Sequence, residues 1–93
     1  MAVFPADRAL QLLLEQQLLV KAETDIEEGW VRIRKQEELL DYLHAGGHDT
    51  RQAERLIEVL KETLVEWERH RGLIQQRINF LEQDVGPTPR TRN

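Results

Sequence analysis

Apolar residues recur every seven positions along most of the chain, the repeat of helices that pack side by side. Up to the middle of the chain, the repeat consists of Leu12, Leu19, Ile26, Ile33 and Leu40. Beyond the middle, two such rows run together: Ala53, Leu60, Trp67, Ile74 and Leu81, and Ile57, Leu64, Arg71, Ile78 and Val85. The pattern predicts an all-α chain with one helix over about residues 6–45 and a second over about residues 50–84.

A glycine pair lies between the two predicted helices. Gly46 or Gly47 can adopt the left-handed conformation that ends a helix, and Asp49 can cap the next one. Gln52 stands three residues after Asp49, which is the spacing of a capping box. A turn over 46–49 is short enough to hold the two helices together as an antiparallel hairpin.

The first predicted helix also carries a signal for an internal break. Thr24 and Glu27 have capping-box spacing. A glycine such as Gly29 destabilises a helix interior by roughly 1 kcal/mol relative to alanine. The apolar repeat keeps its phase across these residues, so we expect one unbroken helix. We also expect the small residues Ala22 and Gly29 to make room for the indole of Trp67 on the facing helix. The alternative is that Gly29 has no packing role.

Arg71 is the one charged residue in the seven-residue rows of the second helix. We expect its side chain either to extend to solvent or to pair with Glu23 or Glu27 of the first helix.

Several large apolar residues lie off the seven-residue rows, near the end of the hairpin away from the glycines. They are Leu10, Leu13, Leu14, Leu18, Val20, Leu73 and Phe80. A chain of 93 residues is near the size at which one core is barely sufficient, and an exposed apolar patch usually marks association. The pattern predicts a homodimer, a two-fold symmetric four-helix bundle that is joined most firmly at this open end.

Composition narrows the class of protein. With no cysteine, the chain forms neither disulfides nor thiolate metal sites. The longest apolar runs are too short to span a membrane, and the start lacks the order of a secretory signal, so we expect a cytoplasmic protein. Residues 1–85 are expected to form one domain, followed by a disordered tail over 86–93.

The charge balance argues against binding to nucleic acid. The formal net charge is −4, and the only locally basic piece is the tail with Arg90 and Arg92. Two arginines are too few to make a nucleic-acid arm.

Catalytic candidates are few, because the chain has no serine and a two-helix chain offers little concave surface. We expect no enzyme and no cofactor. His70 suggests an alternative, since phosphotransfer domains present an exposed histidine on a helical hairpin. Those domains have an acidic residue after the histidine or a nearby Lys-Gly pair, and neither is present here. A second alternative is a surface metal site at the turn, made by His44, His48 and Asp49.

The run Gly47-His48-Asp49-Thr50 and the residues that follow it resemble a group of short uncharacterised bacterial proteins, common in alphaproteobacteria, with a G-H-D-T turn. The similarity covers about residues 23–82 and continues through Ala53, Leu56, Ile57, Leu60, Thr63, His70, Arg71 and Ile74. It implies a bacterial helical hairpin and no particular activity. Our leading hypothesis is therefore a non-enzymatic homodimer that acts through protein contacts as a small adaptor or regulator.

Overall fold

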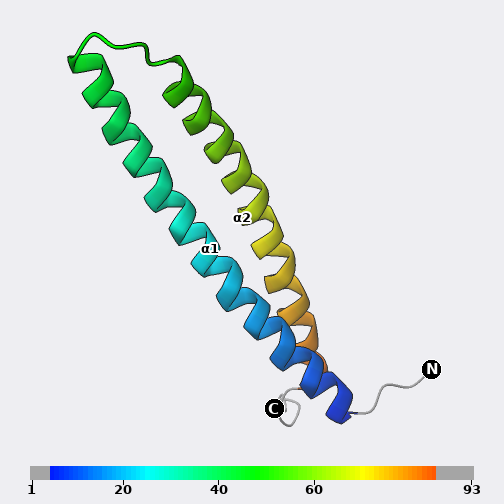
Figure 1. Cartoon of the computed structure of the whole chain (residues 1–93). Coiled ribbons are helices and arrows are strands. Elements are labelled where there is room, and N and C mark those ends of the chain that lie inside the picture. The colour runs from blue at the N-terminus through cyan, green and yellow to red at the C-terminus, as the bar shows by residue number, and fades with distance from the viewer. Residues whose placement is uncertain (1–4, 86–93) are drawn as a thin grey trace, which may run out of the picture.

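The chain folds into two long helices that lie side by side in opposite directions (Figure 1). The computed structural model describes the backbone of residues 5–85 and the side chains of residues 7–83. Helix α1 spans Pro5–Ala45 and helix α2 spans Arg51–Val85. This confirms the predicted all-α hairpin, whereas the tail predicted to be disordered, 86–93, lies outside the described residues.

Helix α1 is continuous through the suspected break, which confirms the prediction from the unbroken apolar phase. Pro5 stands in its first turn, where a missing N–H leaves no helical hydrogen bond unmade, and Asp7 adds a negative charge near the positive end of the helix dipole. Neither α1 nor α2 contains a stretch that is long and apolar enough to cross a membrane.

The seven-residue rows face each other and form the core. Buried apolar residues within 7–83 are Ile26, Ile33, Ala53, Ile57, Leu64, Ile74, Ile78 and Leu81. In the middle of the hairpin, Ile26 and Ile33 of α1 contact Leu64 of α2, with Leu60 and Trp67 packed around them. Ile33, Leu60 and Leu64 therefore belong to one apolar cluster between the two helices.

Gly29 is buried where α1 and α2 approach closely. A β-carbon placed on Gly29 would lie 2.7 Å from Leu64 Cδ2 and 3.6 Å from Trp67 Cζ3. The glycine therefore makes room mainly for the leucine, and the indole that we expected it to accommodate is the more distant neighbour.

Arg71 interrupts the buried row of α2, between Leu64 and Ile78. Its side chain is exposed and forms no ion pair with any residue that the structure describes. Of the two predicted alternatives, Arg71 therefore reaches solvent and does not pair with Glu23 or Glu27.

The turn ends α1 with a Schellman motif. His48 N donates to Leu43 O at 2.9 Å, and Gly47 N donates to His44 O at 3.1 Å. Gly47 has a φ of 72°, so it is the glycine that takes the left-handed conformation. Gly46 still belongs to the helical pattern, because its N–H donates to Tyr42 O at 3.1 Å.

Candidate functional site

Large apolar side chains that remain exposed are more numerous on this hairpin than those that are buried. Between residues 7 and 83 they are Leu10, Leu13, Leu14, Leu18, Val20, Trp30, Leu39, Tyr42, Leu56, Val59, Val65, Leu73 and Phe80. Exposing large apolar side chains to water costs free energy unless another surface covers them. Their distribution over the two helices therefore defines the candidate site.

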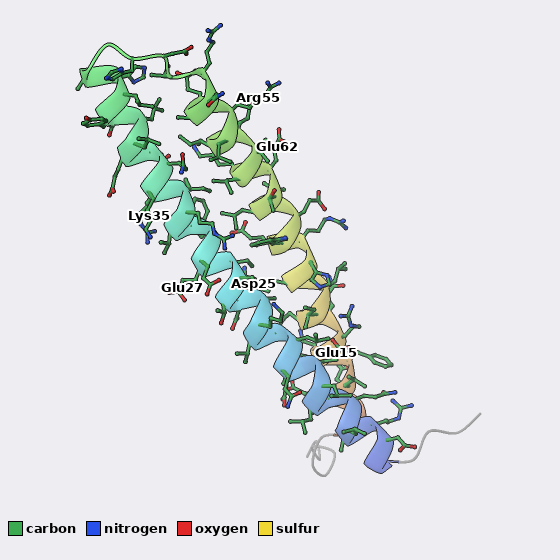
Figure 2. All side chains as sticks on the ribbon, viewed as in Figure 1. Glu15, Asp25, Glu27, Lys35, Arg55 and Glu62 are labelled. Carbon is green, nitrogen blue, oxygen red and sulfur yellow. The ribbon has the colours of Figure 1, made fainter. Side chains whose placement is uncertain are left out.

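A hollow of about 550 Å³ lies between the helices at the open end of the hairpin. Leu14 lines it from α1, and Leu73 and Phe80 line it from α2. Glu15 and Arg77 also line it, and Arg77 Nε donates to Glu15 Oε1 at 3.0 Å, which ties the two helices together there. Figure 2 shows Glu15 on the side of α1 that is turned toward α2.

Only some residues of the predicted interface lie around the hollow. Leu10 and Leu18 stand four residues before and after Leu14, so they continue its flank of α1. Each residue turns a helix by 100°, which places Leu13 and Val20 on the other flank. The predicted single patch is therefore divided between two sides of α1. We name the part around the hollow the open-end patch: Leu10, Leu14, Leu18, Leu73 and Phe80.

A second group of exposed apolar residues, near the glycine turn, includes members that the sequence reasoning missed. We name it the turn-end patch, and its members are Leu39, Tyr42, Leu56 and Val59. The buried rows keep a seven-residue phase, so residues separated by whole sevens lie on one flank of a helix. Leu39 is three such repeats from Leu18, Tyr42 is four from Leu14, and Val59 is two from Leu73. The two patches therefore occupy the same face of the hairpin, and this spacing is the signal that locates the second one.

Polar residues separate the two patches in the middle of this face. A small hollow of about 110 Å³ is lined by Asp25, Trp67 and His70, together with Ala22. Asp25 accepts a hydrogen bond from Lys21 Nζ at 3.0 Å. Along this flank of α1, Leu18, Asp25, Arg32 and Leu39 follow one another at intervals of seven residues. The row is therefore apolar at its ends and carries opposite charges at its centre.

His70, the phosphotransfer candidate, is exposed on this same face. It shares the small hollow with Asp25 of α1. The imidazole is thus accessible to a macromolecular partner, as an acceptor of a phosphoryl group must be.

The turn does not assemble the three residues of the candidate metal site. The Arg51 side chain donates hydrogen bonds to the Asp49 carboxylate from Nε at 3.2 Å and from Nη2 at 2.8 Å. The backbone N–H of Arg51 also donates to Asp49 Oδ1, at 3.0 Å. The Arg51 guanidinium, and secondly its N–H, lower the pKa of Asp49 below the ordinary 3.8. His44 Nε2 lies 3.9 Å from Glu54 Oε2 instead. Across the described residues, no three potential ligands gather closely enough to hold a metal ion.

The start of α2 also differs from the predicted capping box. Asp49 does accept the N–H of Arg51, but the first helical carbonyl is that of Thr50, which accepts from Glu54 N at 2.9 Å. Thr50 Oγ1 donates to Glu54 Oε2 at 3.0 Å. Gln52 makes no hydrogen bond to Asp49 within the described part of the chain, because Thr50 takes the capping position one residue later than predicted.

Comparisons with protein families, with curated proteins and with solved structures gave no match. The face that carries both patches is therefore the feature of the molecule that bears on its function. Its two apolar patches, its charged centre and its shallow hollows are features that suit contact with another protein surface.

Proposed function

We propose that this chain is a cytoplasmic, non-enzymatic homodimer in which two hairpins form a four-helix bundle, and that it acts as a small adaptor or regulator through protein contacts. The observation that carries the proposal is the placement of two apolar patches on one face of the hairpin. A second hairpin stacked on that face would convert both patches into core.

The distribution of burial within the hairpin supports association. The first seven-residue row of α1 is buried at its centre, at Ile26 and Ile33, but only half buried at Leu12, Leu19 and Leu40. In a hairpin of two helices, each row of apolar side chains is covered only by the other helix. The parts of these side chains that stay exposed face the two broad sides of the hairpin. A second layer would complete the burial that α2 begins.

The polar residues support a role in binding over one in catalysis. None of the polar side chains within residues 7–83 is buried. Catalytic acids and bases are usually tuned by burial and by neighbouring charges in a cleft. Among the acids whose side chains the structure describes, only Asp49 has a clearly perturbed pKa, and it is exposed in the turn and bound by Arg51, which suits a structural role.

Sedimentation equilibrium tests the proposal. The chain mass is 11.0 kDa, and we expect twice that mass at micromolar concentrations of protein. A single-chain mass over the whole micromolar range would contradict the homodimer. Loss of helical circular dichroism on dilution, in step with dissociation, is the companion result expected of a bundle that depends on its second copy.

Histidine phosphotransfer through His70 is a second candidate, favoured by the exposure of that imidazole on the same face. The test is incubation with small phosphoryl donors such as acetyl phosphate, followed by mass spectrometry. An acid-labile phosphate present in wild type and absent in His70→Ala supports it, with His44→Ala as the matched control. Labelling that persists in His70→Ala contradicts it.

A further inference from the structure

We propose that the two hairpins pair face to face and antiparallel, so that the open-end patch of each copy covers the turn-end patch of the other. The inference rests on the proposed homodimer and adds its geometry. It follows from the order of residues along the face that carries both patches.

Two symmetric arrangements can bring this face against itself. A two-fold axis along the hairpin places open end on open end and sets α1 against α2 of the second copy. A two-fold axis across the hairpin reverses the second copy, so that α1 lies against α1 and α2 against α2. Both arrangements bury the patches, so the charged centre and the hollow must decide between them.

The charged centre of α1 favours the reversed arrangement. When the axis passes midway between Asp25 and Arg32, Asp25 of each copy lies opposite Arg32 of the other. The same operation places Leu18 opposite Leu39 at both ends of the row. Within this row, opposite charges meet twice and apolar residues meet twice, which is charge complementarity of the kind found in specific interfaces. Figure 2 shows Asp25 on the side of α1 near α2, whereas Glu27 projects from the outer side.

The second helix agrees with the same axis. The axis set by the charges of α1 crosses that helix beside Gly29, which packs against Leu64 of α2. It therefore crosses α2 near Leu64. Leu73 and Leu56 lie nine and eight residues to either side of Leu64, so the axis brings Leu73 of one copy near the level of Leu56 of the other. The axis chosen from the charges of α1 thus also brings apolar residues of α2 together between the two copies.

The hollow at the open end points the same way. Protein interfaces pack at nearly the density of protein interiors, so a hollow of about 550 Å³ is filled better by a protruding side chain than by a second hollow. Open end against open end would set two hollows against each other. The reversed arrangement instead brings Tyr42, which is 70% exposed, to the level of Leu14 in the wall of the hollow.

Distances between the two turns test the orientation directly. The chain has no cysteine, so His48→Cys supplies a single site for a nitroxide label on an exposed turn residue. The distance from the axis to each turn follows from a rise of about 1.5 Å per residue. Pulsed electron–electron double resonance should therefore give a separation of roughly 50–60 Å between the two labels. Adjacent turns, at roughly 10–25 Å, would overturn the inference and leave the homodimer intact. A monomeric mass by sedimentation would overturn both.

Charge reversal is the second test, with sedimentation as the measurement. Asp25→Arg and Arg32→Asp each set like charges against each other, so each should weaken the dimer roughly tenfold or more. The double variant Asp25→Arg/Arg32→Asp restores both pairs and should return the dissociation constant to within about threefold of wild type. A double variant no tighter than the single variants would overturn the inference.

A matched control exists on the other flank of α1. Arg34 and Asp41 are also seven residues apart, are both exposed, and lie off the face that carries the patches. The double variant Asp41→Arg/Arg34→Asp, and each of its single variants, should change the dissociation constant less than about threefold. Losses equal to those at Asp25 and Arg32 would show a general charge effect and overturn the inference.

Discussion

Gly29 of α1 packs directly against Leu64 of α2, beside the buried cluster that Leu64 forms with Ile26 and Ile33. A β-carbon on Gly29 would stand 2.7 Å from Leu64 Cδ2, and Leu64 is only 3% exposed. A glycine that weakens the helix locally is thus the residue that lets the two helices meet.

We predict that Gly29→Ala destabilises the hairpin. Alanine gains roughly 1 kcal/mol of helix propensity, but the new methyl group overlaps the buried side chain of Leu64, and such overpacking costs about 1–3 kcal/mol. The net expectation is a lower midpoint in urea unfolding, followed by circular dichroism. Leu64→Ala removes the colliding atom, so the double variant should lose less stability than the sum of the two single variants. Strict additivity would contradict the contact.

Gly72→Ala is the opposite prediction on the other helix. Gly72 also lies inside a helix, but nothing stands within 4 Å of the place where its β-carbon would be. The substitution should therefore raise the free energy of unfolding by about 0.5–1 kcal/mol. The sign difference between Gly72→Ala and Gly29→Ala, measured in the same urea titration, separates packing from propensity.

The turn supplies a third prediction, again with a neighbouring glycine for comparison. Gly47 has a left-handed φ of 72°, so Gly47→Ala should cost about 1 kcal/mol or more. At Gly46 the nearest atom to a new β-carbon is His48 Cδ2 at 2.7 Å, the exposed end of a flexible side chain. Gly46→Ala should consequently be tolerated with a smaller change in thermal midpoint. Equal losses at the two positions would contradict the assignment of the Schellman motif to Gly47.

The fold was predictable from the sequence because a seven-residue apolar repeat fixes both the helical period and the facing sides. The continuity of α1 followed from the phase of that repeat, even across Gly29. The closest neighbour of Gly29 across the core was not predictable, since spacing alone does not show that Leu64 approaches Gly29 more closely than Trp67 does.

The candidate site was predictable only in part. Leu13 and Val20 were grouped with Leu14 because they are close along the chain, although the helical turn separates them. The turn-end patch was missed because its members are scattered among charged residues and become a group only across two helices. The Asp49 carboxylate is bound by Arg51 instead of being available to a metal ion, and no spacing rule predicts that contact.

The pH behaviour of Asp49 is a fourth prediction. The Arg51 guanidinium lowers the pKa of this carboxyl, so its contribution to stability is present above pH 3.8 and is lost as the pH falls through the lower folded-state pKa. Carbon-detected NMR titration should give a midpoint below 3.8 for Asp49 in wild type. Arg51→Gln should move that midpoint upward, since it removes the largest cause of the shift. An unchanged midpoint in Arg51→Gln would show that the pair does not persist in solution.

The final prediction separates the two flanks of α1 and tests the division of the apolar residues. Leu18 and Val20 are both exposed, two residues apart, but 200° of helical rotation places them on nearly opposite sides. Leu18→Ser removes an apolar contact from the open-end patch and should weaken dimerisation by about 1–2 kcal/mol. Val20→Ser should change dimerisation by less than about 0.5 kcal/mol. Sedimentation equilibrium of both variants gives the two free energies, and a larger loss at Val20 would place the interface on the other flank of α1.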